Sequence, residues 1–288
     1  MKIRKPVFAG SWYPGTENEC RRQIESFIKD NRFDTSLSGQ KPAGIVPHAG
    51  WSFSGDLAAA VFDALAGGDA GGIPDVVVLF GMHMPPGVRP VMMKEGAWAT
   101  PLGEVPVASD LGEKVAAAHR FEMETPDAFA PENTIELQVP LVKYFFDGAQ
   151  VLTIGAPAGP AAMGIAETVV SEARALGLSL RIIGSTDLTH YGVSFGFTPA
   201  GQGQGAYEWV RDTNDRQVID AMLAMDPEGV IREALDNQNA CCPGAAAAAI
   251  TAARALGAKR SKLVGYSSSY EKNPGATFVG YGGILYAQ

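Results

Sequence analysis

The stretch DVVVLFG (75–81) decides the fold of this chain. It is an unbroken run of β-branched and large apolar residues, which is typical of a strand covered on both faces and so of a parallel sheet. Three similar runs occur elsewhere: AGIVPH (43–48), AQVLTIGAP (149–157) and LRIIGSTD (180–187). Near the C-terminus, SKLVGYSSSY (261–270) and ATFVGYGGILYA (276–287) predict a closing pair of strands joined by a turn at EKNPG.

Helical patterns separate these runs, and the alternation predicts an α/β fold with a central, mixed, mainly parallel sheet flanked by helices. The expected helices cover residues 20–30, 55–67, 109–120, 133–146, 161–177, 214–225 and 243–257, with a short one after Asp226-Pro227. No repeat, linker or break in composition marks a boundary, so residues 1–288 are expected to form a single domain. The Gly-rich stretch 191–207 is expected to be an irregular loop over a site.

The composition of this 288-residue chain narrows the class of protein. Hydrophobic residues make up 46% and charged residues 19%, which excludes intrinsic disorder. A net charge of −8 repels phosphate backbones and anionic lipid, so neither nucleic acid nor a membrane surface is an expected partner. No apolar run approaches the roughly 18–20 residues that cross a bilayer. An odd count of 3 cysteines and no apolar signal core at the start indicate the reducing cytoplasm.

Chemically versatile side chains follow the predicted strands, where ligands bind in open α/β sheets. Of the 4 histidines, His48, His83 and His190 lie there. Asp187 precedes His190 by three residues, and an aspartate at this spacing can orient an imidazole for proton transfer. We therefore predict Asp187 and His190 as catalytic residues, with a turn-capping aspartate as the alternative. Structural roles are expected for four other residues of similar chemistry: Cys20, His119, Glu132 and Glu136.

His48 and His83 are candidate metal ligands, because neutral imidazole is the commonest metal ligand in proteins. Cys242 directly precedes a predicted helix, whose dipole favours the thiolate, and it would complete a three-ligand, open-sided site. The residues alone also allow two hydrogen-bonded histidines near turns and a buried cysteine that only packs. The adjacent Cys241 is an alternative to Cys242 as the thiolate ligand.

Seven short blocks run in order along almost the whole chain: RKPVFAGSWYP (4–14), PHAGWSFSG (47–55), VLFGMH (78–83), ENTIELQVP (132–140), STDLTHYG (185–192), NACCPG (239–244) and VGYG (279–282). Together they resemble the Memo-like family, which in prokaryotes is also called AmmeMemoRadiSam system protein B. The resemblance implies a fold like that of the class III extradiol dioxygenases, with the site at the ends of strands.

The same resemblance implies a site. The dioxygenases hold non-haem iron with two histidines and a carboxylate, whereas the Memo-like family has two histidines and a cysteine and is linked to iron or copper. Carried over to this sequence, the ligands are His48, His83 and Cys242, with Asp187 and His190 lining the pocket. Iron or copper is thus the expected ion, and zinc is a further candidate.

This chain departs from the family pattern at three places in the expected site. The Glu-His-Ser block of the family reads Glu132-Asn133-Thr134, so an amide that cannot act as a base replaces a pocket histidine. Where the family has Cys-Gly, this chain has Cys242-Pro243, so Cys241 is again an alternative to Cys242 as the ligand. Phe80-Gly81-Met82 replaces the usual Gly-Pro-Ser before His83.

Three functions follow from this reading. The first is a metal-binding redox protein with an open coordination position. The second, from a different class, is a non-enzymatic adaptor that binds a peptide or small molecule in the same pocket, as eukaryotic relatives are described to do with phosphotyrosine peptides. The third is a ring-cleaving dioxygenase, which the cysteine ligand and Asn133 disfavour. The prokaryotic family name also implies radical-SAM and AMMECR1-like proteins as partners.

Overall fold

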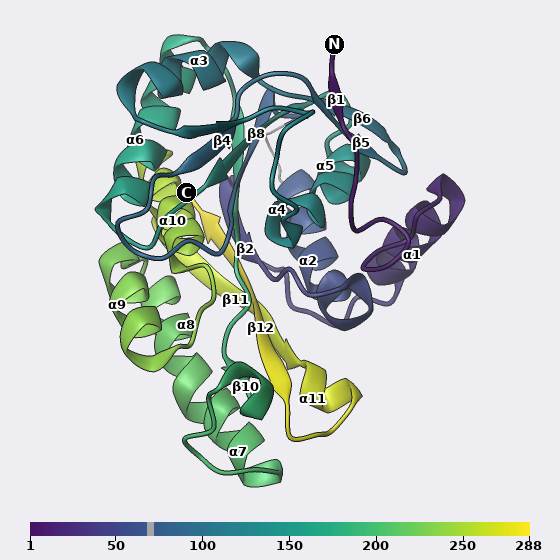
Figure 1. Cartoon of the computed structure of the whole chain (residues 1–288), viewed down its shortest axis with the longest axis vertical. Coiled ribbons are helices and arrows are strands. Elements are labelled where there is room, and N and C mark those ends of the chain that lie inside the picture. The colour runs from purple at the N-terminus through teal and green to yellow at the C-terminus, as the bar shows by residue number, and fades with distance from the viewer. Residues whose placement is uncertain (68–71) are drawn as a thin grey trace.

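The computed structural model describes residues 1–67 and 72–288, and a large twisted sheet runs through its centre (Figure 1). Within the described residues this sheet has 9 strands in the order β10-β12-β2-β9-β3-β8-β4-β7, with β11 also paired to β12. The strands are β2 (Ala43–Val46), β3 (Val76–Gly81), β4 (Val91–Met93), β7 (Glu122–Glu124), β8 (Gln150–Gly155), β9 (Leu180–Ser185), β10 (His190–Tyr191), β11 (Arg260–Ser268) and β12 (Phe278–Ala287). A small second sheet joins β1 (Ile3–Arg4), β5 (Ala97–Thr100) and β6 (Gly103–Pro106).

The expected mixed sheet with a parallel centre is confirmed. Strands β2, β9, β3 and β8 are neighbours and run parallel. On one side β12 pairs antiparallel with β2 and β11, which is the predicted closing pair, and on the other side β4 pairs antiparallel with β8. Every residue of β2, β3 and β9 is buried, as expected for strands covered on both faces.

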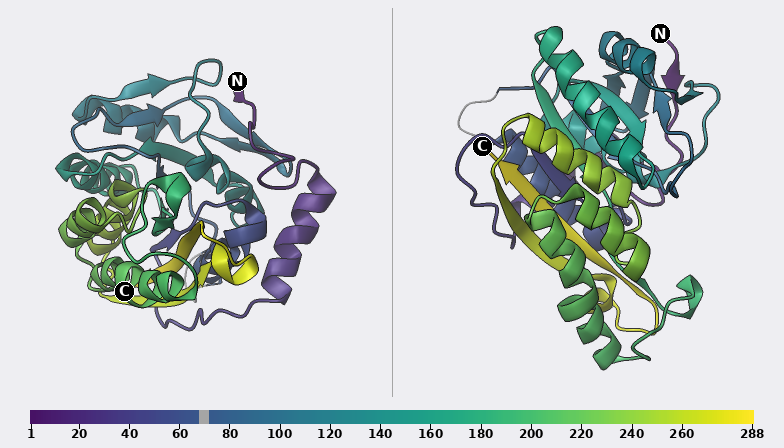
Figure 2. Two further views of the ribbon diagram at one scale, coloured as in Figure 1. Left: turned by 60° about the horizontal axis from the view of Figure 1, so that its bottom comes forward. Right: turned by 90° about the vertical axis from the view of Figure 1, so that its left-hand side faces the viewer.

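Helices cover both faces of the sheet, and each face has its own apolar core (Figures 1 and 2). One face carries α3 (Ser109–Ala118), α6 (Pro160–Ala175), α8 (Asp215–Leu223), α9 (Pro227–Asn237) and α10 (Pro243–Ala255). The other carries α1 (Glu17–Lys29), α2 (Trp51–Ala66) and α5 (Val139–Phe145). The remaining described elements are three short α-helices, a 3-10 helix and a π-helix: α4 (Asn133–Glu136), α7 (Gln204–Trp209), α11 (Ser269–Lys272), η1 (Val193–Phe195) and η2 (Val210–Asn214). Among the described residues, no helix combines the length and apolarity needed to cross a membrane.

Helix α10 packs unusually close to the sheet, because its buried face is made of alanines. A Cβ on Gly184 of β9 would come within 2.8 Å of both the Ala245 carbonyl oxygen and the Ala249 methyl group. At the start of the helix, a Cβ on Gly244 would overlap the carbonyl oxygens of Ala156 and Pro157. Small residues therefore let the N-terminus of α10 reach the ends of the central strands.

Four predictions about elements were wrong in detail. Residues 133–146 form two helices, α4 and α5, since Pro140 lacks the N–H that a continuous helix needs. Helix α2 begins at Trp51, four residues before its predicted start at Gly55. The stretch 191–207 is not wholly irregular, because it includes the end of β10 and the beginning of α7. The short strands β1 and β4 to β7 were not predicted. Strands β1, β4 and β7 pair with strands distant in the sequence, whereas β5 and β6 pair with each other across a tight turn.

Candidate metal centre

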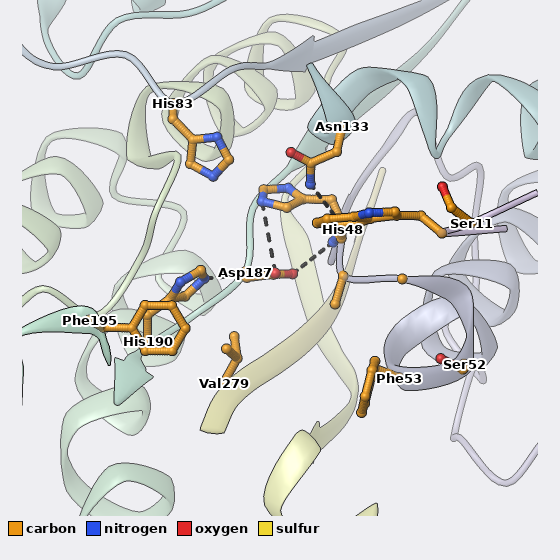
Figure 3. A pocket seen from close by; sticks show the side chains of 13 residues that line it. Ser11, His48, Ser52, Phe53, His83, Asn133, Asp187, His190, Phe195 and Val279 are labelled. Atoms are coloured by element: carbon orange, nitrogen blue, oxygen red, sulfur yellow. Dashed lines mark hydrogen bonds and ion pairs between the residues drawn. The ribbon is translucent and has the colours of Figure 1, made fainter. Parts of the chain in front are cut away.

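The pocket at the carboxyl ends of the central strands is lined by four of the five predicted site residues, all except Cys242 (Figure 3). Strands β2, β9 and β3 lie side by side, and each is followed two residues later by His48, Asp187 and His83 respectively. The parallel direction of these strands therefore brings the three side chains to one edge of the sheet. They line a pocket of about 430 Å³, together with His190 and Asn133. In Figure 3 the rings of His48, His83 and His190 face one space.

His48 is buried, and its neighbours determine which ring nitrogen is free. The Ser185 hydroxyl donates to the Thr134 carbonyl at 2.7 Å, so its oxygen is left to accept from His48 Nδ1 at 3.1 Å. With the proton on Nδ1, the lone pair of the neutral ring is on Nε2, which lies 3.2 Å from Cys241 Sγ. Burial opposes a charge on His48, but Asp187 and Cys241 outweigh it and raise its pKa to about 8.

His83 is oriented in the same manner by a carboxylate. Its Nδ1 lies 3.3 Å from Glu132 Oε1, while Glu132 also caps α4 by accepting from the Thr134 N–H at 3.0 Å. Hydrogen bonds with Cys241 and Glu132 raise the pKa of His83 to about 10. A carboxylate on the outer ring nitrogen is the usual support of a metal-bound histidine, because it fixes the tautomer and raises the ligand's basicity.

Two adjacent cysteines complete a group of four side chains, His48, His83, Cys241 and Cys242, which we call the ligand cluster. Their ligand atoms all lie within 4.8 Å of one another. Cys242 is buried and Cys241 is half-buried, and the two sulfur atoms are 3.7 Å apart. The predicted ligands His48, His83 and Cys242 are therefore close together, and Cys241, the alternative, makes the direct contact with His48 Nε2.

The thiols differ in their ionisation. Burial opposes the charge on Cys241, but a hydrogen bond with Cys242 and the nearby His48 outweigh it and hold the pKa of Cys241 well below its usual value. Burial, together with the adjacent Cys241 thiolate, holds the pKa of Cys242 well above its usual value. Without a metal, the cluster therefore keeps a thiolate beside protonated imidazoles, and a bound cation would displace those protons.

The turn after β9 holds the cysteine pair in place. The Cys241 N–H donates to the Asp187 carbonyl at 3.1 Å, and the Cys242 N–H donates to Thr186 Oγ1 at 3.1 Å. In return, the Asp187 N–H donates to Cys241 Sγ at 3.3 Å. These bonds pair the turn before α10 with the turn after β9, so the thiols are positioned by two elements rather than by one loop.

The predicted pair Asp187 and His190 lies at the side of the ligand cluster. Asp187 Oδ1 accepts the His48 backbone N–H at 2.7 Å, and Oδ2 lies 3.9 Å from Nε2 of both His48 and His190. Nε2 of His190 is buried and has no hydrogen-bond partner. The His190 ring packs edge-on against Phe195, with centroids 4.8 Å apart. His190 thus directs an unpaired polar atom toward the pocket, where a ligand can meet it.

Asn133, which stands where the family pattern has a histidine, also lines the pocket. Its side-chain amide donates to the His48 carbonyl at 3.1 Å. Sequence reasoning missed two supporting residues, Ser185 and Glu132, since each was explained by a strand end or a helix start. For Glu132 the signal was its place directly before Asn133 in a block that already pointed to the pocket.

Three exposed aromatic side chains form what we call the aromatic rim: Trp12, Phe53 and Phe195. Trp12 comes from the N-terminal loop, and the buried Glu136 carboxylate anchors this loop by accepting from the N–H groups of Val7 and Phe8. Glu136 thus has the structural role expected of it. Cys20 packs in α1, and His119 bonds to Thr168 Oγ1 at 2.7 Å, so both lie outside the site as expected.

Comparison with known proteins extends the resemblance over the whole chain. The family model described as Memo-like protein matches residues 4–285. A MEMO1 family protein of Pyrococcus abyssi is 30% identical over 293 residues, covering 98% of this chain and 99% of the relative. One of Methanothermobacter thermautotrophicus is 31% identical over 278 residues, covering 93% and 94%.

Among solved structures, an uncharacterized protein of Escherichia coli K12 aligns with a TM-score of 0.49 and 12% identity, covering 84% of this chain and 99% of that one. A likeness so distant supports no argument about the site. The family model and the archaeal relatives both span almost the full length, and on that ground the chain belongs to the Memo-like family.

Proposed function

We propose that this protein binds a transition-metal ion through His48, His83 and Cys241, and that the ion serves a ligand or substrate in the adjoining pocket. One observation carries the proposal: two imidazoles and a low-pKa thiol converge with their ligand atoms within 4.8 Å. In the sequence these residues are up to 193 positions apart, so only the fold brings them together.

The surroundings of the ligand cluster fit a metal ion better than they fit a hydrogen-bonded core. Both histidines have their outer nitrogen occupied, His48 by Ser185 and His83 by Glu132, so the inner nitrogens are available. Borderline-soft imidazole and soft thiolate together suit copper, zinc and iron, in accord with the iron or copper expected from the sequence. A bound copper or iron ion would supply one-electron redox chemistry.

The chain's own residues would then act on whatever enters the pocket. His190, with its unpaired Nε2, can donate to or accept from a polar group of the ligand, and Asp187 Oδ2 lies 3.9 Å from the same nitrogen. The aromatic rim would hold an apolar or planar part of that ligand away from water.

The test is metal content by elemental analysis, on protein purified without oxygen, a polyhistidine tag or chelator. Wild type should hold close to one equivalent of copper, zinc or iron, and His48→Ala and Cys241→Ala should each lose it. Cys20→Ala removes a cysteine of α1 outside the ligand cluster and should retain the metal. Wild-type protein that holds no metal, and takes up none of these three ions when they are added, would overturn the proposal.

A second candidate is a binding protein without redox chemistry, and the aromatic rim favours it. Trp12, Phe53 and Phe195 are 42%, 39% and 43% exposed around a pocket, which is typical of a surface that contacts a peptide or small molecule. The metal analysis separates the two candidates, since this one predicts that metal-free protein keeps its ligand-binding capacity.

A further inference from the structure

The second cysteine of the ligand cluster has no part in the three-ligand site. We propose that Cys242 is a fourth ligand, which makes the site a closed two-histidine, two-cysteine centre for a thiophilic d¹⁰ cation, zinc(II) or copper(I). This inference rests on the proposed function, because it requires that His48, His83 and Cys241 hold a metal. It changes the expected chemistry, since a filled tetrahedron leaves no open position for dioxygen or substrate.

The distance between the sulfur atoms supports this proposal. In a tetrahedral site with metal–sulfur bonds of about 2.3 Å, two thiolates lie about 3.8 Å apart. Sγ of Cys241 and Sγ of Cys242 are 3.7 Å apart. The corresponding sulfur–nitrogen separation is about 3.5 Å, and Cys241 Sγ lies 3.2 Å from His48 Nε2. Only small side-chain movements would therefore turn these contacts into the edges of a coordination tetrahedron.

The backbone before α10 explains how neighbouring residues can both face the cluster. Successive side chains of an extended strand point in opposite directions, whereas Cys242 is the N-cap of α10 and has φ −128° and ψ 60°. The Cys241 and Cys242 N–H groups are both bonded to the β9 turn, which fixes this bend. Gly244 then allows the helix to pass directly over the Ala156 and Pro157 carbonyls. The two thiols are thus held side by side before any metal binds.

The burial of Cys242 also points to a ligand. It is 1% exposed, its thiol makes no capping bond to α10, and its sulfur is hydrogen-bonded to the Cys241 sulfur at 3.7 Å. Cys242 packs within the apolar core, yet its sulfur lies against the sulfur of Cys241, a residue proposed as a ligand. The 3.7 Å separation is well beyond the roughly 2.05 Å of a disulfide, so both thiols are free to bind.

Two thiolates would also decide which metal is preferred. Soft sulfur ligands select copper(I) and zinc(II), and a tetrahedral set of two nitrogens and two sulfurs is typical of zinc. Iron(II) at a catalytic site in proteins usually has two histidines, a carboxylate and open positions. The second thiolate would thus shift this member of the family away from iron and toward a d¹⁰ ion.

Cobalt(II) provides the test, because it occupies zinc sites and its sulfur-to-metal charge-transfer absorption grows with the number of thiolate ligands. Under anaerobic conditions, wild type should bind one equivalent with tetrahedral visible bands. Cys242→Ser should still bind cobalt, with charge-transfer absorbance per bound ion reduced to about half. Cys20→Ser serves as the matched control and should match wild type.

The outcomes separate the two proposals. Equal charge-transfer absorbance in wild type and Cys242→Ser would overturn the fourth ligand, while the three-ligand site would stand. Wild type that binds no cobalt, zinc or copper(I) would overturn the fourth ligand, and wild type that binds no iron either would overturn both.

X-ray absorption on the zinc(II)-loaded and copper(I)-loaded wild type needs no variant and so does not depend on how well Cys242→Ser folds. Two sulfur scatterers per metal support the proposal, and one sulfur overturns it. The two loaded forms also show which of the d¹⁰ ions has the complete ligand set.

Competition between zinc(II) and iron(II) measures the preference of the site for one metal over the other. The ratio of zinc affinity to iron affinity should be at least about tenfold higher in wild type than in Cys242→Ser.

Discussion

The ligand cluster and the aromatic rim border the same pocket, but they are built in opposite ways. His48 is 2% exposed and Cys242 is 1% exposed, and the backbone N–H groups of both donate to side chains of the turn after β9, to Asp187 and Thr186 respectively. The rim residues are about two-fifths exposed. Trp12 comes from a loop, Phe195 is the last residue of a short 3-10 helix (Val193–Phe195), and Phe53 comes from the first turn of α2. Rigid strand ends therefore support the chemistry, whereas exposed segments contact whatever enters. Changes at the cluster should affect metal binding and stability, and changes at the rim should affect neither.

The largest effect is expected where α10 approaches the strand ends. Gly244→Ala places a Cβ against two backbone carbonyl oxygens that cannot move easily. We expect a loss of about 3 kcal/mol in the free energy of unfolding, measured by urea denaturation. Gly205→Ala is the matched control, because Gly205 is likewise the second residue of a helix and has open space around it. That variant should be neutral or more stable by up to about 1 kcal/mol. Equal losses in both would show that α10 has room to shift.

Lowering the pH should release the metal without disturbing the rim. The pKa of His48 is about 8 and that of His83 is about 10, so below pH 8 a metal must displace a proton from each imidazole. Each displaced proton weakens binding tenfold per pH unit, so a site with His48, His83 and Cys241 should lose about a hundredfold in affinity for each unit below 8. If Cys242 is also a ligand, its thiol proton is displaced as well, and the loss should be about a thousandfold per unit. Competition with a chelator of known pH dependence measures it. A pH-independent affinity would mean that the histidines are not ligands.

Removing the supports of the histidines should weaken the metal site by a smaller factor. Ser185→Ala deletes the acceptor for His48 Nδ1, and Glu132→Gln replaces the carboxylate beside His83. Each should lower zinc affinity by about 10- to 100-fold, because the ring tautomer and orientation are no longer fixed. Ser52→Ala, which lines the same pocket, is the control and should keep wild-type affinity. Unchanged affinity in both test variants would indicate that the inner nitrogens do not bind the metal.

The smallest effect is expected at the rim. Phe195→Ala removes an exposed ring that packs on His190 but contacts no residue proposed as a ligand. Zinc affinity should change by less than about twofold. The free energy of unfolding should change by less than about 0.5 kcal/mol. A large loss of metal affinity in this variant would show that the rim and the cluster are coupled through His190.

The unbroken apolar runs allowed the central sheet to be predicted, because only strands buried on both faces need such sequences. Strands β4 and β7 could not be predicted this way, since each has three residues and depends on distant partners. The histidines at strand ends could be predicted from the rule that ligands bind beyond the carboxyl ends of parallel strands. The choice between Cys241 and Cys242 could not, because it depends on the dihedral angles of one turn and on its bonds to β9.

The sequence by itself determined the parallel sheet, the family and the placing of His48, His83, Asp187 and His190 at one edge, since apolar patterning and strand direction are local properties of the chain. Tertiary structure alone decided that two cysteines, rather than one, face those histidines, and that Ser185 and Glu132 orient the rings. The physical reason is that ligand geometry depends on contacts between segments far apart in the chain. No local sequence pattern predicts where α10 packs against the ends of β9 and β8.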